Sequence, residues 1–322
     1  MTRHEAAAPA EVNYMAEWTG LIDSVADTPP EVLRDQLLAL RARWSQRDLT
    51  DTADEIERLL ASGEDYETGL PLVVGPNGLL DAWPTFRVFL LDALGVADPN
   101  RAVEIARHVI SETKSGDEYA IALRSLARQG PWRAEETELL EHFDRMLRNE
   151  SWWQDQGFAE AFDMARVLGS EAAASTVLHW SGNPALRSQA LHEFAAEHPA
   201  EILSVLQSGS PLAAEDAAKL FARADPGDPV QAETIDAYLR NPATDPASAK
   251  TFLGLFPLRS ATTGHRLYGN APAPFSNESV REGDLAALAL VETWLADPAL
   301  QPSRAELLKL RGKLVDWTSP DE

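Results

Sequence analysis

The stretch NPALRSQALHEFAAEHPAEILSVLQSGSP, residues 183–211, contains the pattern that decides the fold. Asn183 is a favourable N-cap, and Pro184 suits the first helical position, where its missing N–H costs nothing. The apolar residues that follow fall on one helical face: Leu186, Ala190, Leu191 and Phe194. His198-Pro199 then starts a second helix, whose apolar face contains Ile202, Leu203 and Leu206. The stretch therefore predicts two short amphipathic helices in immediate succession.

The same start signals recur at the end of this stretch and on both sides of it. They are found at Pro30, Asp98-Pro99, Ser210-Pro211, Asp228-Pro229 and Asp245-Pro246. From Pro184 to Pro246, consecutive starts are 12 to 18 residues apart. Two such steps make a helix pair of roughly 30 to 35 residues, within the range of helical solenoid repeats.

This arrangement resembles that of HEAT-like and other α-helical repeat proteins over roughly residues 84–250. The sequence contains no ankyrin, tetratricopeptide or leucine-rich consensus, so the resemblance is to the superfamily of helical repeats. It implies an all-α solenoid of antiparallel helix pairs, whose concave face binds another protein. We therefore predict an all-α fold.

Two segments interrupt the helical pattern. In residues 63–87, the apolar runs LPLVV and LLDAW flank the turn sequence GPNG, which predicts a small β-hairpin near 70–83. The second segment is a long loop after residue 255. The expected organisation is a helical cap or small bundle (1–62), an irregular or hairpin connection (63–87), a helical-repeat solenoid (88–255), a long ordered loop (256–282) and C-terminal capping helices (283–322).

Composition and charge exclude several classes of protein. The 322 residues are 44% hydrophobic and carry a net charge of −23, which repels nucleic acid and anionic membranes. There are no cysteines, and the longest purely apolar run, Leu285 to Val291, is too short to span a bilayer. We expect a cytoplasmic protein if Met1 is the native start, and a periplasmic or extracytoplasmic one if a signal or anchor precedes it.

No catalytic or metal-binding motif is recognisable in the sequence. HEFAAEH places His192 and His198 six residues apart, whereas two zinc ligands on one helical face need a spacing of four. A G-x-S-x-G elbow and a P-loop are both absent from the sequence. We therefore predict no catalytic residues, no metal and no cofactor.

Trp152 and Trp153 are the most suggestive of the nine tryptophans. Adjacent helical side chains point about 100° apart, so both cannot occupy the centre of one buried face. Either both indoles pack on neighbouring helices, or one is partly exposed and contributes to a binding surface, where tryptophan is enriched.

Most of the loop LFPLRSATTGHRLYGNAPAPFSNESVREGD, residues 255–284, overlaps a stretch without any acid that extends from Pro246 to Asn277. It carries the candidate binding residues Arg259, His265, Arg266 and Tyr268. Three interpretations are open. The loop is a strap that pairs its arginines with the protein's own carboxylates, a site for an anion or a partner, or a disordered segment.

Three functional hypotheses follow. The first is a non-catalytic scaffold or adaptor that binds another protein, favourably a basic one, through an acidic helical surface. The second is an all-α hydrolase or lyase with a site between segment 63–87 and loop 255–284, combining Asp81, His265 and Arg266. The third is a structural subunit of a homo-oligomer.

Overall fold

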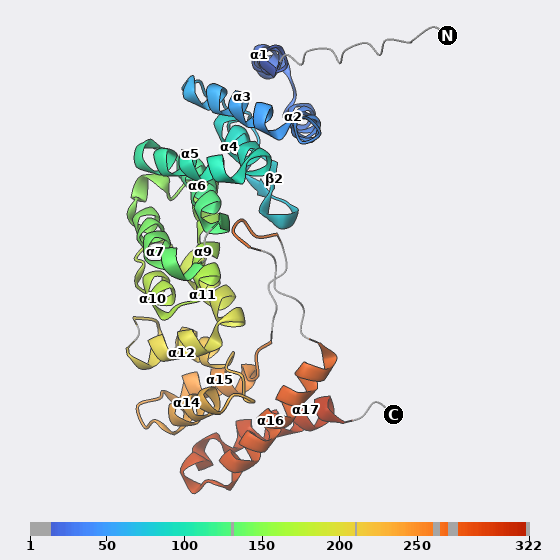
Figure 1. The fold of residues 1–322 in the computed structure, drawn as a ribbon. Coiled ribbons are helices and arrows are strands. Elements are labelled where there is room, and N and C mark those ends of the chain that lie inside the picture. The colour runs from blue at the N-terminus through green and yellow to red at the C-terminus, as the bar shows by residue number, and fades with distance from the viewer. Residues whose placement is uncertain (1–13, 130–131, 210, 260–264, 270–275, 320–322) are drawn as a thin grey trace, which may run out of the picture. The chain divides into compact units, whose positions relative to one another are not determined.

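The computed structural model describes the chain except for residues 1–13, 130–131, 210, 260–264, 270–275 and 320–322. The described residues form an all-α fold with one two-stranded antiparallel sheet, which confirms the predicted fold class (Figure 1). The chain divides into two compact units: unit 1 contains Met1–Gly75 and Leu79–Gln129, and unit 2 contains Pro76–Gly78 and Gly130–Glu322. The boundary after Gln129 falls inside segment 88–255, for which the sequence predicted a single solenoid.

Unit 1 contains six helices and the two hairpin strands among its described residues. The elements are α1 (Tyr14–Ser24), the 3₁₀ turn η1 (Val25–Asp27), α2 (Pro30–Trp44), α3 (Leu49–Ala61), β1 (Val73–Val74), β2 (Leu80–Ala82), α4 (Phe86–Ala97), α5 (Pro99–Glu112) and α6 (Gly116–Gln129). Helix α4 packs against α2, α3, α5, α6 and β2. Its apolar residues are buried on every side, as expected of the central helix of a unit.

The hairpin confirms the sheet expected near residues 70–83. Val73 pairs with Ala82 and Val74 with Leu80, and the turn η2 (Pro76–Gly78) joins the strands. Asn77 in this turn has φ of 58°, a left-handed conformation that asparagine tolerates better than most residues. The GPNG sequence is therefore the local cause of the hairpin.

A buried carboxylate on α4 ties the hairpin to the helices of unit 1. Asp92 has no exposed surface and accepts hydrogen bonds from Arg41 (2.8 Å), Arg124 (2.6 Å) and the indole N–H of Trp83 (3.0 Å). These donors come from α2, α6 and the end of the hairpin. Arg41 also lies over the Trp83 ring, 5.1 Å from its centroid. One side chain thus joins α4 to the neighbouring hairpin and to α2 and α6, which are distant from Asp92 in sequence.

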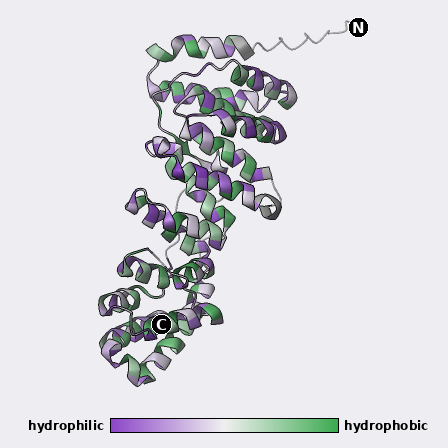
Figure 2. Ribbon diagram, turned by 90° about the vertical axis from the view of Figure 1, so that its left-hand side faces the viewer, coloured by the Kyte–Doolittle hydropathy of each residue, from purple (hydrophilic) through white to green (hydrophobic). Residues whose placement is uncertain are grey.

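Unit 2 contains the remaining helices. The elements are α7 (Trp132–Arg148), the 3₁₀ turn η3 (Glu150–Trp152), α8 (Gln156–Ala161), α9 (Asp163–Leu168), α10 (Glu171–His179), α11 (Pro184–Glu197), α12 (Pro199–Gln207), α13 (Ala214–Phe221), α14 (Pro229–Arg240), α15 (Pro246–Leu255), α16 (Asn277–Ala296), η4 (Pro298–Ser303) and α17 (Arg304–Thr318). Hydrophobic and hydrophilic residues are mixed along the helices (Figure 2). None of the helices in the described part of the chain is long and apolar enough to cross a membrane.

The helices of unit 2 pack mainly against near neighbours in the sequence. Helix α10 contacts α7, α9, α11 and α12, and then α12 contacts α13 and α14, α13 contacts α15, and α15 contacts α17. Each helix therefore buries its apolar face against the helices one, two or three positions away. Such short-range packing is what consecutively stacked helices produce.

The cap-and-proline signals largely place the helix starts correctly. The side chains of Asn183, Asp228 and Asp245 each accept backbone N–H groups in the first turns of α11, α14 and α15. Helix α13 differs, because it begins at Ala214 rather than at the expected Pro211. Ser210, the expected cap, lies outside the described residues.

The long loop ends earlier than its predicted boundary at residue 282. Helix α16 begins at Asn277, because the hydroxyl of Ser276 accepts the N–H of Ser279 and caps the helix. The polar sequence NESVRE conceals this start, since the first two turns of the helix, residues 277–282, contain a single apolar residue, Val280. The C-terminal helices therefore include six residues that were assigned to the loop.

The substitution Asp92→Ala is expected to lower the free energy of unfolding by about 3 to 5 kcal/mol, because two guanidinium groups lose their buried counter-charge. Chemical denaturation monitored by circular dichroism measures this loss. Asp81→Asn is the matched control, since Asp81 lies 4.0 Å from the same Arg41 at a third-exposed position and should cost less than about 1 kcal/mol. Equal losses in the two variants would contradict the role assigned to Asp92.

Candidate functional site

The paired tryptophans lie just after the C-terminal end of α7 and face different surroundings. Trp152 is 5% exposed and belongs to the core, whereas Trp153 is only half-buried. The two indoles diverge as their adjacency in sequence requires. Trp153 contributes its ring to the wall of a cavity of about 530 Å³ in unit 2. It is thus the member of the pair that can contact a ligand.

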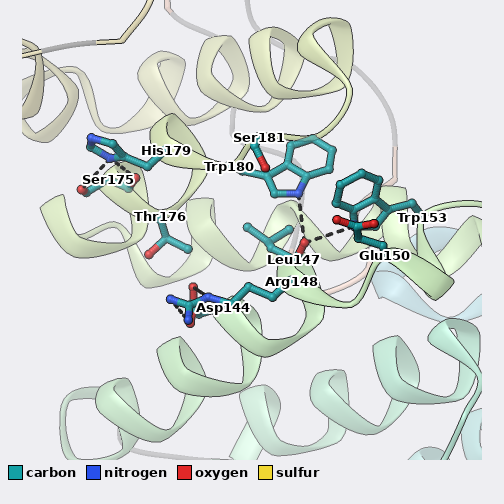
Figure 3. A pocket seen from close by; sticks show the side chains of 10 residues that line it. All are labelled: Asp144, Leu147, Arg148, Glu150, Trp153, Ser175, Thr176, His179, Trp180 and Ser181. Carbon is teal, nitrogen blue, oxygen red and sulfur yellow. Dashed lines mark hydrogen bonds and ion pairs between the residues drawn. The ribbon is translucent and has the colours of Figure 1, made fainter.

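A single backbone carbonyl fixes the indole of Trp153. The Leu147 carbonyl oxygen, in the last turn of α7, accepts the Nε1–H of Trp153 at 3.1 Å and that of Trp180 at 3.0 Å (Figure 3). Carbonyl groups in the last turn of a helix have no partner within the helix and need an external donor. Because this bond already uses the Trp153 N–H, the ring offers a ligand its aromatic surface rather than a donor.

An aromatic cluster supports Trp153 from behind. Its ring meets that of Trp180 nearly at right angles, at 5.5 Å between centroids. Trp180 packs in turn against Phe158 (5.6 Å) and Phe162 (4.9 Å). Trp180 is 6% exposed, so it gives the cavity a rigid wall. Aromatic contacts of this kind add about 1 kcal/mol each to the stabilisation that comes from burying the rings.

The rim of the cavity is polar and slightly acidic. Arg148 and Asp144 form a bidentate ion pair across one turn of α7, with distances of 3.0 and 2.9 Å, so their charges largely cancel. Within the described residues, the exposed Glu150 carboxylate makes no hydrogen bond or ion pair. His179 and Ser175 bond to each other on α10, while Thr176 and Ser181 add hydroxyl groups (Figure 3). The uncompensated charge at this rim is therefore negative.

The loop arginines are paired with carboxylates of the protein itself. Arg259 donates to Asp284 on α16 at 2.5 Å and to the Val280 carbonyl at 2.6 Å. Arg266 pairs with Glu193 on α11 and lies 3.9 Å from Asp163 on α9. These contacts favour the interpretation of the loop as a strap on the acidic helices of unit 2.

The residues around Arg266 are docked through backbone and apolar contacts as well. The Tyr268 N–H donates to the second oxygen of Asp163 at 3.0 Å, and Tyr268 and Leu267 are almost completely buried. His265 is exposed on the edge of a smaller cavity of about 240 Å³ beside Arg266. The structure thus brings three of the four loop candidates to one place, while Arg259 is held separately on α16.

Acidic groups outnumber basic ones where Arg266 docks. Asp163 also accepts from Arg166 at 2.6 Å, and Arg166 bridges to Glu197 at 2.8 Å. Burial raises the pKa of Glu160, and the neighbouring carboxylates Asp163 and Glu193 raise it further. Arg266 lowers the pKa of Glu160 and so offsets part of this repulsion. The guanidinium of Arg266 therefore relieves an excess of negative charge among buried carboxylates.

The two histidines of HEFAAEH have separate structural partners. His198 lies 2.6 Å from the Arg166 carbonyl through its Nε2 atom, and His192 accepts the Nε–H of Arg223 at 3.2 Å. Burial, together with the positive charges of Arg223 and Lys219, lowers the pKa of His192 to about 4, so this imidazole is neutral at pH 7. Within the described ranges, no group of three His, Cys, Asp or Glu side chains is arranged to hold a metal ion.

The enzyme hypothesis joins residues from different units. Asp81 belongs to unit 1, and His265 and Arg266 belong to unit 2. Within unit 2, Arg266 already forms an ion pair with Glu193. The shared site stays a prediction from the sequence.

Several residues of the cavity escaped the sequence analysis. Trp180, Leu147 and Glu150 belong to no catalytic or binding motif, and only the folded structure places them around one cavity. In the comparisons with known proteins, no family model, curated protein or solved structure matches the chain. The evidence on function is therefore the geometry of the site itself.

Arg266→Ala is expected to lower the free energy of unfolding by about 3 kcal/mol, because Glu193 and the buried Asp163 lose a positive partner. His265→Ala, one residue away and exposed, serves as the control and should change stability by less than about 0.5 kcal/mol. Urea denaturation of both variants makes the comparison. An Arg266→Ala protein as stable as the wild type would contradict the strap.

Glu160→Gln is expected to stabilise the protein at pH 7. Since the pKa of Glu160 is raised above its ordinary 4.5 on folding, the folded state binds more protons than the unfolded state between pH 4.5 and the raised value. The contribution of Glu160 to the free energy of unfolding is thus complete below pH 4.5. It is lost as the pH rises through the pKa that Glu160 has in the folded state. The advantage of Glu160→Gln over the wild type should shrink from pH 7 to pH 5 in parallel urea titrations. An advantage that grows on acidification would refute this assignment.

Proposed function

We propose that this chain is a non-catalytic helical-repeat scaffold that binds a basic segment of another protein, with the cavity at Trp153 as a point of contact. The observation that carries the proposal is the half-buried indole of Trp153, held rigidly by the Leu147 carbonyl beside the uncompensated carboxylate of Glu150. This combination suits the side chain of a lysine or an arginine.

The chemistry of such a contact is favourable on two counts. A cation over the face of a tryptophan ring gains about 0.5 to 2 kcal/mol, depending on how far it is desolvated. A carboxylate at the rim adds a charge-assisted hydrogen bond, and the hydroxyl groups of Ser175, Thr176 and Ser181 suit the polar backbone of a peptide. Rigid, partly exposed tryptophans of this kind are enriched among the residues that dominate binding energy.

The charge of the whole chain supports the same class of partner. A net charge of −23 attracts basic segments over long distances and accelerates their association, and it repels polyanions. The near-neighbour packing of the helices in unit 2 supports the helical-repeat part of the proposal, because stacked helices present extended binding surfaces.

The test uses fluorescein-labelled ten-residue peptides of alternating lysine and serine, with glutamate–serine and glutamine–serine peptides for comparison. Fluorescence anisotropy should show binding of the lysine peptide alone, weakened by salt as expected for an interaction between exposed charges. Trp153→Ala should weaken binding at least tenfold, as should Glu150→Lys, which changes an exposed residue and leaves the aromatic cluster intact.

Trp317→Ala is the matched control, because Trp317 on α17 is 54% exposed and does not line this cavity. It should bind the lysine peptide as the wild type does. Equal affinity of wild type, Trp153→Ala and Glu150→Lys for the lysine peptide would reject the cavity as the contact. Failure of all three peptides to bind the wild type would reject the preference for a basic partner.

A further inference from the structure

Helix α17 has two apolar faces, and the fold of unit 2 uses one of them. Leu307, Leu310 and Leu314 are buried in the core of the unit, where α17 packs on α15 and α16. On the opposite side, Leu308 is 49% and Val315 38% exposed. A surface helix normally presents charged and polar residues at such positions.

The exposed residues of this second face follow a regular spacing. Ala305, Leu308, Gly312 and Val315 recur at intervals of three, four and three residues, and all four are exposed. This is the spacing of a seam along which two helices pack, and we call these four residues the α17 seam. With a rise of 1.5 Å per residue, the seam extends along about 15 Å of the helix.

Gly312 has no explanation within the chain itself. A Cβ atom added at this position would meet no atom of the structure within 4 Å. Glycine in an exposed helix interior is less stable than alanine by about 1 kcal/mol. A glycine at the middle of an apolar seam is instead suited to the close approach of another backbone.

The charges beside the seam are self-complementary. Lys309 and Asp316 are exposed and lie seven residues apart, on the same flank of the seam. In an antiparallel pair of α17 helices centred near Gly312, Lys309 of each copy lies beside Asp316 of the other. Lys309, whose side chain is 72% exposed, also contacts the less exposed Glu306 of its own helix at 3.0 Å. Its ammonium group has three donors, so this contact leaves donors for Asp316 of the other copy.

The charge on the other flank of the α17 seam does not disfavour the antiparallel pairing. Arg311 is already paired with Glu292 on α16 at 2.5 Å, so its charge is compensated before association. Helix α17 carries four basic residues and two acidic ones, in contrast to the strongly acidic chain as a whole. Two copies therefore repel each other less through this helix than a net charge of −23 on each would imply.

We propose that the α17 seam is a self-association surface at which two copies of this chain pair their α17 helices antiparallel about Gly312. A seam formed by one helix from each copy is smaller than the roughly 800 Å² per partner of standard interfaces. The expected dimer therefore forms at micromolar concentrations. This proposal is independent of the peptide cavity, because it involves different residues and a different partner.

The test is analytical ultracentrifugation of the full chain from 1 to 500 µM. The wild type should show a reversible monomer–dimer equilibrium, and Leu308→Glu should raise the dimer dissociation constant at least tenfold. Trp317→Glu is the matched control, since it places the same charge on the same helix away from the seam and should leave dimerisation unchanged.

Two further variants examine the geometry. Lys309→Asp should weaken the dimer, and the double variant Lys309→Asp/Asp316→Lys should restore it. Gly312→Ala should raise the melting temperature of the monomer yet weaken the dimer, a combination that a purely structural glycine would not give.

A wild type that remains monomeric at 500 µM would overturn the proposal, whether or not it binds vesicles of anionic lipid through α17. Equal dissociation constants for wild type and Leu308→Glu, or failure of the double charge reversal to restore association, would also overturn it.

Discussion

The carbonyl group of Leu147 is the constraint on which the candidate site depends. It lies in the last turn of α7, where the helix provides no donor, and two indole N–H groups supply its hydrogen bonds. Satisfying this one acceptor brings Trp153 and Trp180 together and orients both rings. The rings that line the cavity are therefore oriented by the need of the last turn of α7 for hydrogen-bond donors. This aromatic wall is rigid before a ligand binds. Such preorganisation reduces the entropy lost on binding.

The sequence predicts much of the fold, because helix starts are local. The side chains of Asn183, Asp228 and Asp245 cap their helices through residues two or three positions away, so each start can be recognised without tertiary information. The GPNG turn is equally local. The start of α16 at Asn277 is harder to recognise, because the first two turns of that helix are polar and carry one apolar residue.

Tertiary contacts between distant residues set the limit of prediction. The charge of Arg266 in an acid-free stretch suggests docking on carboxylates, but the sequence does not identify Glu193 and Asp163 as partners. In the sequence, nothing distinguishes Asp92 from the other acidic residues of the helices. Only the folded structure shows that its carboxylate accepts hydrogen bonds from Arg41, Arg124 and Trp83. For the candidate site, the adjacency of Trp152 and Trp153 predicts that the two indoles diverge, whereas Trp180 gives no signal of its own. The spacing of the α17 seam is visible in the sequence, but its exposure is not.

The central claim is that Trp153 contacts a cationic side chain of a partner. Fluorine NMR of the protein labelled with 5-fluorotryptophan observes the nine indoles separately, once each resonance is assigned by substitution. During titration with the lysine–serine peptide, the Trp153 resonance should shift most and that of Trp317 should stay in place. A saturating titration that leaves Trp153 unchanged, or that shifts Trp317 instead, would contradict the account.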